Sequence, residues 1–330
     1  MFFAVCKVKD WPLFLHQDNY KEAMNYFETY INIEDEAKNC VIVIGNFDGV
    51  HLGHQALLSC GRALANESRM PLGVLTFEPH PRQLFRPDEP PHRITPKDLK
   101  ADRLECSGVD FVFSLPFDWD FASQSADQFV QDILIDGLAA SHVVIGSDFR
   151  FGQLRQGCAE TIRKAGIPVT VLEKIKNGDQ DISSSAIRQA LRQGDLDVAN
   201  EMLGWDWEIR GEIIKGDQRG RELGYPTANM ALKDTVHPAY GVYAVLARLE
   251  GEDQWHMGAT NIGIRPMFAV PMAQVETYIF DFDKEIYGKT LCVRPVKRLR
   301  GEAKFDSLDA LVVQMAKDCE QARALLKAYL

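Results

Sequence analysis

Residues 41–54, "VIVIGNFDGVHLGH", indicate how the first part of the chain folds. Four apolar residues are followed by ten residues that contain three glycines and two histidines. A short apolar run that ends in a glycine-rich turn is typical of a buried strand leading into a helix. The free N–H groups at the start of such a helix, and the positive end of its dipole, favour an anion. The stretch therefore predicts a strand, a turn and a helix that together form a phosphate site.

The segments that follow repeat this alternation. Helical patterns at 54–68, 96–108, 125–138 and 159–166 alternate with apolar runs at 71–81, 109–117, 140–152 and 167–175. Apolar strands separated by helices indicate a Rossmann-like parallel sheet that is covered on both faces. Ligands bind beyond the carboxyl ends of the strands in such sheets. The loops at 45–54, 77–81 and 146–152 are therefore expected to converge on one cleft.

From about residue 205 the pattern changes to strands separated by turns. Apolar or alternating runs lie at 207–216, 227–232, 241–251, 256–264, 275–282 and 291–299. This pattern predicts an antiparallel β-barrel or sandwich, followed by a C-terminal helix whose apolar stripe packs on it. The stripe comprises Leu308, Leu311, Val312, Met315, Cys319, Ala322, Leu325 and Leu326. We therefore expect two domains, residues 1–204 and residues 205–330.

Residues 1–38 are harder to place than the rest of the chain. Within them, residues 19–33 fit an amphipathic helix that has Ala23, Tyr26, Phe27 and Tyr30 on one side. The sequence predicts no role for this segment.

Composition narrows the class of protein. A length of 330 residues favours two domains. The net charge of −10 argues against general affinity for nucleic acid or acidic membranes. Seven widely spaced cysteines indicate reduced thiols, and no apolar run approaches the roughly 20 residues that span a bilayer. We expect a cytoplasmic protein, and self-association is left open.

The two histidines of the first stretch are candidate catalytic residues. His51 and His54 are three residues apart and lie on one face of the first helical turn, where both can donate hydrogen bonds to phosphate oxygens. The alternative is a tight turn with two partly exposed histidines. The other residues of the turn expected to bind the nucleotide are Gly45, Asn46, Asp48, Gly49 and Gly53. The pattern H-x-G-H resembles the signature of the nucleotidyltransferase superfamily, which releases pyrophosphate from a nucleoside triphosphate.

Three further segments, "LTFEPHP", "VIGSDFRFG" and "ISSSAIR", resemble signatures of bacterial FMN adenylyltransferases. That resemblance implies that Ser184, Ser185 and Arg188 contact the triphosphate and that Asp148 reaches the nucleotide. Residues Ser183, Ser184 and Ser185 could instead serve only to cap a helix. Phe85 and Phe151 are candidates to flank the isoalloxazine ring, with core packing as an equal alternative.

The second part of the chain carries another constellation, "GDQRGRELGYPTANM" at 216–230. Its glycines suit a loop that folds over a nucleotide. Thr227 and Asn229 are two apart, so on a strand they point the same way, and both offer oxygen ligands for Mg²⁺. A turn-rich loop with two polar strand residues is the alternative. The stretch resembles a riboflavin kinase motif, which implies nucleotide contacts from Gly216, Gly220, Arg221 and Gly224.

Further residues match the same kinase family. Glu276, on an apolar strand, is by resemblance the base that receives the proton of the riboflavin 5′-hydroxyl. A partly buried glutamate paired with a base such as Arg294 is the alternative. The resemblance also implies flavin contacts from Asn261, Arg265 and Arg323. Met267 stands where the family usually has threonine.

Together these motifs cover roughly residues 40–328 and resemble the prokaryotic bifunctional riboflavin kinase/FMN adenylyltransferase family. The resemblance implies conversion of riboflavin and ATP to FMN and ADP, followed by conversion of FMN and ATP to FAD and pyrophosphate, both with Mg²⁺. One alternative is an adenylyl- or cytidylyltransferase of another substrate with a fused β domain. Another is a catalytically inactive flavin-binding regulator.

Overall fold

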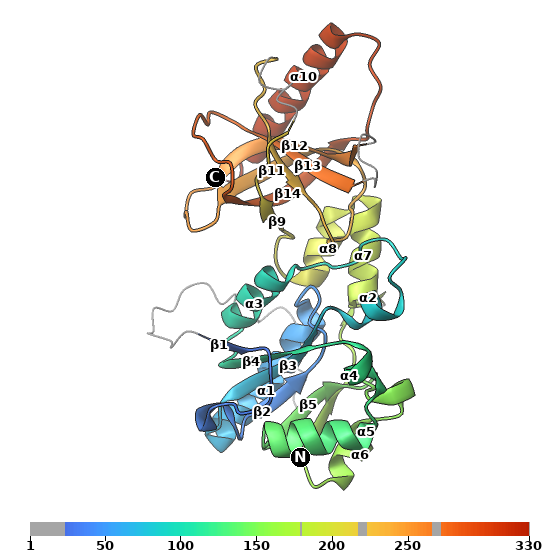
Figure 1. The fold of residues 1–330 in the computed structure, drawn as a ribbon. Coiled ribbons are helices and arrows are strands. Elements are labelled where there is room, and N and C mark those ends of the chain that lie inside the picture. Colours follow the sequence, from blue (N-terminus) through green and yellow to red (C-terminus); the bar gives the residue numbers. More distant parts are fainter. Residues whose placement is uncertain (1–23, 179, 217–222, 266–271, 330) are drawn as a thin grey trace.

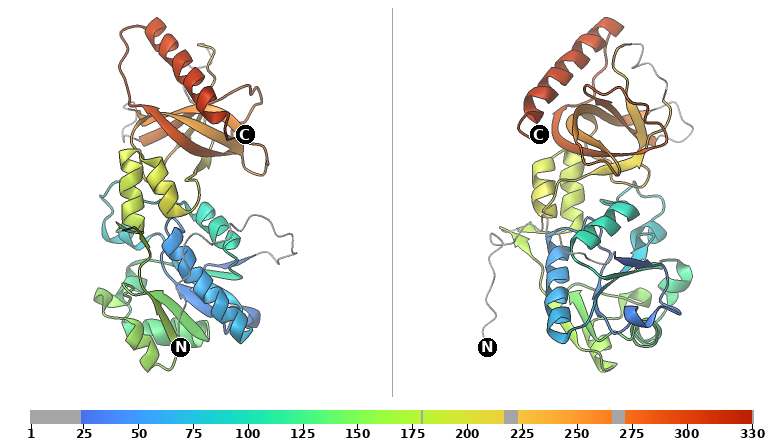
Figure 2. Two further views of the ribbon diagram at one scale, coloured as in Figure 1. Left: turned by 180° about the vertical axis from the view of Figure 1, so that it is seen from behind. Right: turned by 90° about the vertical axis from the view of Figure 1, so that its left-hand side faces the viewer.

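The computed structural model describes residues 24–178, 180–216, 223–265 and 272–329. A parallel sheet with its helices and a β-barrel are stacked along the long axis of the molecule (Figure 1). Two helices, α7 (Ser184–Gln193) and α8 (Leu196–Leu203), lie between them in all three ribbon views (Figures 1 and 2). The α/β domain, the antiparallel barrel and the C-terminal helix expected from the sequence are confirmed.

The first sheet has six strands, and all of its strand pairs are parallel. In spatial order the strands are β1 (Asn25–Phe27), β4 (Phe111–Pro116), β3 (Leu72–Glu78), β2 (Val41–Ile44), β5 (His142–Gly146) and β6 (Val169–Leu172). The connection order reverses direction between β2 and β5. Loops that leave the carboxyl ends of strands at such a switch point border the ligand crevice.

Helices cover both faces of this sheet. The π-helix η3 (Phe129–Gly137) and α6 (Ala159–Lys164) contribute to the apolar cluster on one face, and α1 (Leu52–Ser68) and α3 (Lys97–Cys106) to the cluster on the other. The same part of the chain also contains α2 (Pro81–Phe85), α4 (Trp119–Ser123) and α5 (Ala126–Gln128). Strand β2 is apolar at every position because both of its faces are covered. Its Ile42 and Ile44 pack in the cluster that includes η3, whereas Val41 and Val43 pack in the cluster that includes α1. Shorter elements are η2 (Asp35–Ala37), η4 (Gln153–Arg155) and the two-stranded β7 (Lys176–Asn177) and β8 (Gln180–Asp181).

The helix expected over residues 19–33 is wrong for the part that the structure describes. Residues 25–27 form β1, an edge strand that pairs in parallel with β4. Phe27 packs in the cluster on one face of the sheet and Tyr26 in the cluster on the other. This opposite orientation of neighbours is the period-2 arrangement of a strand.

The second sheet closes into a barrel. In spatial order its strands are β10 (Ala228–Ala231), β13 (Met272–Ile279), β12 (His256–Arg265), β11 (Gly241–Leu249), β14 (Thr290–Arg300) and β9 (Ile209–Glu212). All neighbours within it are antiparallel. The chain just after β9 meets β10 through an isolated antiparallel bridge between Ile214 and Asn229, whose N–H···O distance is 2.8 Å. This bridge joins the two edges and closes the ring.

The C-terminal helix α10 (Leu308–Leu326) packs on the barrel with only part of its predicted stripe. Ala322 and Leu326 are buried in a cluster with strands β11 and β12. Leu308 and Leu325 are exposed, at 59% and 40%. The first turns of α10 stand clear of the barrel (Figure 2), and Leu325 near the end of the helix is exposed, so only part of the predicted stripe is buried.

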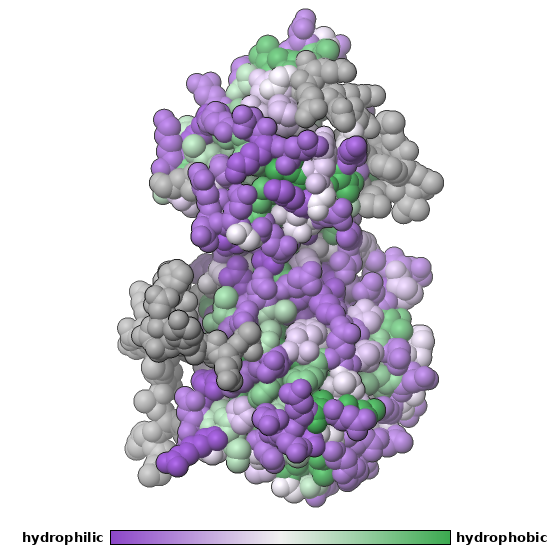
Figure 3. Space-filling view, turned by 60° about the vertical axis from the view of Figure 1, so that its left-hand side comes forward, coloured by the Kyte–Doolittle hydropathy of each residue, from purple (hydrophilic) through white to green (hydrophobic). Residues whose placement is uncertain are grey.

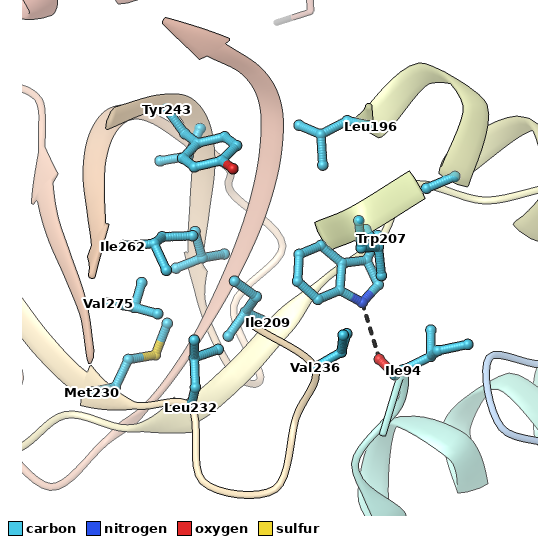
Figure 4. Packing of buried hydrophobic residues seen from close by; sticks show 14 of the residues in the cluster. Ile94, Leu196, Trp207, Ile209, Met230, Leu232, Val236, Tyr243, Ile262 and Val275 are labelled. Atoms are coloured by element: carbon cyan, nitrogen blue, oxygen red, sulfur yellow. Dashed lines mark hydrogen bonds between the residues drawn. The ribbon is translucent and has the colours of Figure 1, made fainter. Parts of the chain in front are cut away.

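One apolar cluster joins α7, α8 and the barrel interior (Figure 4). At its centre Trp207 is fully buried, and its indole Nε1–H donates to the carbonyl of Ile94 at 3.0 Å. Other members are Ile187, Leu191, Leu196, Leu203, Ile209, Val236 and Tyr243. Side chains from both sides of residue 204 therefore share a core, and the division of the chain at that residue stays a prediction.

The surface of the molecule is mostly hydrophilic. Hydrophilic residues cover most of the face shown in Figure 3, which narrows between the sheet and the barrel. Among the described residues, no helix is long and apolar enough to cross a lipid bilayer.

Candidate active sites

Residues 45–54, here called the phosphate loop, connect β2 to α1. Three of them adopt positive φ angles: Phe47 at 50°, Gly49 at 90° and Val50 at 36°. At Gly49 an added Cβ would also lie 3.2 Å from Ile94. Such φ values are rare for residues with side chains. The sharp turn explains why glycine is needed here, and it brings His51 to the N-cap position of α1.

The two predicted histidines stack on each other. Their ring centroids are 3.7 Å apart and the rings are inclined by 19°. His51 Nδ1 accepts the backbone N–H of His54 at 3.3 Å, so the proton of neutral His51 is on Nε2. Within the described part of the chain, the buried Nδ1 atom of His54 has no hydrogen-bond partner. Both rings lie at the start of α1 with donor capacity for an incoming anion.

Burial keeps both rings neutral near pH 7. It lowers the pKa of His51 to about 4, against an opposing effect of the Asp48 carboxylate. Burial, with a smaller contribution from His51, also lowers the pKa of His54 well below its ordinary value. A neutral imidazole still donates one N–H bond, so neither ring needs a positive charge to bind phosphate.

This burial has a consequence for stability. The pKa of His51 is lower in the folded chain than in the unfolded chain. Its contribution to the free energy of unfolding is therefore complete above pH 6.5 and is lost as pH falls towards 4. The shift corresponds to about 3 kcal/mol. We expect His51→Asn, which keeps a helix-capping acceptor, to flatten the pH dependence over this interval by about that amount. Urea denaturation at several pH values measures it, and parallel curves for both proteins would contradict the expectation.

Asp48 is a residue of the phosphate loop that forms a buried ion pair with Arg188. It is buried, and its Oδ2 lies 2.6 Å from Nη2 of Arg188. Burial raises the pKa of Asp48, but Arg188 and His80 outweigh this effect and leave the pKa below its ordinary value. Ser184 donates from Oγ to the Asp48 carbonyl at 2.9 Å. The carboxylate is thus held ionised by a buried guanidinium.

The three residues predicted to meet the triphosphate differ in their surroundings. Arg188 also donates from Nε to the His92 carbonyl at 2.6 Å and is 6% exposed. Ser183 caps α7 by accepting the N–H of Ala186, and Ser185 is exposed. Ser183 therefore acts as a helix cap. Contacts of Ser184, Ser185 and Arg188 with a triphosphate stay predictions.

The loops expected to converge do line one cavity, of about 800 Å³. Asn46, His80 and Asp148 come from the three predicted loops. Cavities of this size hold ligands as large as nucleotides and flavins. Asp148 is exposed, and its Oδ2 lies 3.1 Å from Nζ of Lys174. The expectation of a shared cleft is confirmed.

The cavity wall is rich in aromatic rings. Phe85 is 53% exposed and makes edge contacts with Phe117 at 5.8 Å and Trp119 at 5.7 Å. Phe151 is 7% exposed, and its ring centroid is 4.9 Å from that of Phe129. Phe85 is therefore accessible to a planar ligand, whereas Phe151 is largely buried in the core although it also lines the cavity.

Several cavity residues lie outside the motifs quoted above. They are Arg82, Arg86, Phe117, Trp119, Phe121 and Arg155. Arg82 and Arg86 both pair with Glu89 at 2.6 Å. Their only signal in the sequence is proximity to "FEPHP" and "GSDFRFG". A mixed wall of rings and guanidinium groups suits a ligand that is planar and anionic.

The predicted kinase residues lie in one row across three strands. Asn229 on β10 is opposite Glu276 on β13, and Glu276 is opposite Asn261 on β12. Directly opposite residues of an antiparallel sheet project from the same face. Asn229 is buried, Glu276 is half-buried and Asn261 is exposed. The row therefore runs from the buried Asn229 to the exposed Asn261. It places Glu276 beside Asn229, which lies 47 positions earlier in the sequence.

The first member of this row has the features of a metal ligand. Asn229 donates from Nδ2 to the Thr227 carbonyl at 3.0 Å. Its Oδ1 is buried and, among the described residues, lacks a hydrogen-bond partner. A Cβ on Gly216 would lie 2.7 Å from the Asn229 amide, so glycine leaves the space beside it open. An orphaned amide oxygen in such a space fits Mg²⁺, which takes oxygen ligands.

The remaining kinase predictions divide into placed and unplaced residues. Arg323 forms two bonds with Asp281, at 2.6 and 3.0 Å, and lies 4.3 Å from the ring centroid of Phe280. Gly224 has a φ of 83°. Arg294, the alternative partner of Glu276, donates from Nε to Glu208 at 3.1 Å. Predictions for Gly220, Arg221, Met267 and the side chain of Arg265 lie outside the described residues.

Comparisons with known proteins cover both constellations. Residues 33–186 match the model of the FAD synthetase family and residues 203–326 that of the riboflavin kinase family. Bifunctional riboflavin kinase/FMN adenylyltransferases are 39% identical in both Bacillus subtilis, over 88% of this chain and 93% of that protein, and Escherichia coli K12, over 87% and 92%.

A solved structure has the same overall arrangement. It is described as a macrolide-efflux protein from Streptococcus pneumoniae and is 32% identical, with a TM-score of 0.80. The similarity covers 92% of this chain and 99% of that one. Together with the two family models and the curated relatives, this places the chain in the family of bifunctional riboflavin kinases/FMN adenylyltransferases.

Proposed function

We propose that this enzyme phosphorylates riboflavin to FMN and then adenylylates FMN to FAD, using ATP in both steps. The observation that carries the proposal is the presence of two separate phosphate-transfer arrangements in one chain. The stacked histidines stand at the start of α1 near an aromatic cavity, and the Asn229–Glu276–Asn261 row lies across the barrel. Each arrangement suits one of the two reactions.

Adenylyl transfer would take place at the phosphate loop. A phosphate oxygen of FMN attacks the α-phosphorus of ATP, a new P–O bond forms and the bond to pyrophosphate breaks. His51 and His54 are proposed to donate hydrogen bonds to oxygens of the triphosphate as negative charge develops. The first N–H groups of α1 add to this stabilisation. The aromatic cavity would hold the isoalloxazine ring, with Phe85 as the accessible ring.

Phosphorylation of riboflavin would take place at the row on the barrel. The 5′-hydroxyl oxygen attacks the γ-phosphorus of ATP, the bond to ADP breaks, and Glu276 receives the hydroxyl proton. Asn229, through Oδ1, and Thr227 would hold Mg²⁺, which neutralises phosphate charge when bound. We assign adenylylation to residues 1–204 and phosphorylation to residues 205–330, joined by the shared core around Trp207.

The proposal also includes a cytoplasmic location and small-molecule partners. The six cysteines within the described residues are free, which fits the reducing cytoplasm. The acidic net charge fits a protein that acts on small molecules and not on nucleic acid.

A time course tests the whole proposal. The protein is incubated with riboflavin, ATP and Mg²⁺, and the flavins are separated chromatographically. We expect FMN to appear first and FAD after it, and excess EDTA to stop both. FMN without FAD would reject the adenylyltransferase assignment, and unchanged riboflavin would favour a flavin-binding regulator.

A further inference from the structure

Residues 92–95, here called the strap, lie behind the phosphate loop and hold it by hydrogen bonds. Asp48 Oδ1 accepts the backbone N–H of Ile94 at 2.8 Å and that of Thr95 at 3.1 Å. Thr95 Oγ1 accepts the N–H of Gly49 at 3.0 Å. These three bonds are buried. The strap thus fixes the middle of the loop, immediately before the two histidines.

The other side of the strap is bonded to the barrel domain. The N–H of Arg93 donates to the Asp234 carbonyl at 3.1 Å, and the N–H of Val236 donates to the Arg93 carbonyl at 2.6 Å. Trp207 donates to the Ile94 carbonyl, as Figure 4 shows. One short segment of the first domain is therefore held between the phosphate loop and the kinase domain.

The side chain of Arg93 strengthens this connection. Its Nη1 lies 3.1 Å from Asp234 Oδ2, and its Nη2 forms an ion pair with Glu78. Arg93 and Glu78 are mostly buried, with side chains 11% and 14% exposed, whereas Asp234 is 39% exposed. A planar guanidinium can bridge two carboxylates in this way, which lysine cannot do with the same geometry.

From Glu78 the contacts continue to the start of the phosphate loop. Glu78 Oε1 lies 2.5 Å from Nζ of Lys100. Lys100 donates to Thr76 Oγ1 at 3.3 Å, and Thr76 donates to the Asn46 carbonyl at 3.2 Å. Arg93 is therefore connected to the phosphate loop in two ways. One connection is the backbone of the strap, and the other is the series of side-chain contacts through Glu78, Lys100 and Thr76.

We propose that Arg93 is a positioning residue for adenylyl transfer, through which Asp234 of the kinase domain holds the phosphate loop in its catalytic position. The inference rests on the proposed function, because it assumes that the loop binds the triphosphate. Arg93 touches neither of the two histidines in this arrangement. It acts on them by fixing Asn46, Asp48 and Gly49.

The expected effect follows from the geometry that phosphoryl chemistry requires. A displacement of about 1 Å between catalytic groups and the reacting phosphorus can cost on the order of 100-fold in rate. The aromatic rings of the flavin cavity lie outside the loop, so loosening the loop should leave them in place. The turnover number for adenylylation should therefore fall, while the KM for FMN changes little.

Four variants test the proposal with both activities measured in the same protein. We expect Arg93→Met and Asp234→Ala to lower kcat for FMN adenylylation by about 10-fold or more, with the KM for FMN within about threefold. The kcat for riboflavin phosphorylation should stay within about twofold. Arg93→Lys should restore part of the lost rate. In the double variant Arg93→Met/Asp234→Ala, the second change should add little to the first, because both act through one contact.

Lys297→Met is the matched control. It removes an ion pair across the same junction, between β14 and α8, whose Nζ to Asp197 Oδ2 distance is 2.8 Å. This pair does not include the strap, so both activities should stay at the wild-type level. Wild-type adenylylation in parallel separates failure of this inference from failure of the proposed function.

The outcomes are distinguishable. Wild-type kcat for adenylylation in a folded Arg93→Met variant would overturn the proposal. A parallel fall of both activities, or an equal effect of Lys297→Met, would also overturn it, because such effects indicate general loss of stability at the junction. Thermal unfolding of each variant identifies that loss directly.

Discussion

Replacing His51 and His54 together by alanine is expected to abolish FAD formation while riboflavin is still converted to FMN. The stacked rings lie at the start of α1, and both are neutral near pH 7 because of their burial. Removing one donor that stabilises developing charge costs about 10²–10³ in kcat. Losing two at one phosphate should bring adenylylation close to the uncatalysed level, with FMN as the accumulating product.

The helix cap has to be separated from catalysis in this experiment. His51 accepts the N–H of His54, so its removal also costs about 1 kcal/mol of stability. His51→Asn keeps a capping acceptor and should lose FAD synthesis with little loss of stability. His142→Ala is a matched control, because that ring lies at the amino end of β5 and bonds Thr170. Loss of both activities in the double variant would contradict the assignment of one chemistry to each site.

The sequence predicted most elements of the fold because their patterns were strong. Apolar strands such as β2 need cover on both faces, and the alternation with helices leaves few topologies other than a parallel sheet. The prediction for β1 was wrong because this strand has only three residues and both of its faces are covered. Its neighbours Tyr26 and Phe27 are both apolar, so they fit one side of a helix as well as two sides of a strand.

The predicted site residues were found through local motifs, and the structure adds what those motifs do not contain. The pairing of Asn229, Glu276 and Asn261 depends on strand register, which no single motif specifies. The overestimated stripe of α10 has a similar origin. A hydrophobic period shows which side of a helix could be buried, but not how far the partner surface extends along it.

The strap was not predictable from side-chain patterns. Its sequence, "HRIT", matches no motif, and most of its bonds use backbone atoms. On one side the strap bonds Asp48, which is 46 residues away from Ile94 in the sequence. On the other side it bonds Asp234, which is 141 residues away from Arg93. Contacts at such separations follow from tertiary packing, so only the structure could reveal that the kinase domain touches the support of the phosphate loop.

Glu276→Gln is expected to stop riboflavin phosphorylation and to leave adenylylation of supplied FMN intact. Glutamine has nearly the same size and stays between Asn229 and Asn261 in the row, but its amide accepts the hydroxyl proton far less readily than a carboxylate. Loss of a general base lowers the rate by about 10²–10⁴. The initial rate of FMN formation from riboflavin measures this effect, and FAD formation from FMN in the same protein reports that the fold is intact.

Asp283→Asn is the control for loss of a carboxylate near the end of the same strand. Asp283 is exposed and lies beyond the end of β13, so both activities should remain at the wild-type level. Glu276→Ala distinguishes a base from a space-filling residue: a catalytic carboxylate predicts similar losses for glutamine and alanine, whereas a packing role predicts that glutamine retains activity. Kinase turnover above a few per cent of wild type in Glu276→Gln would show that another group receives the proton. Asn229 and Asn261, as neutral amides, do not meet that requirement, so the base would then have to come from outside the row.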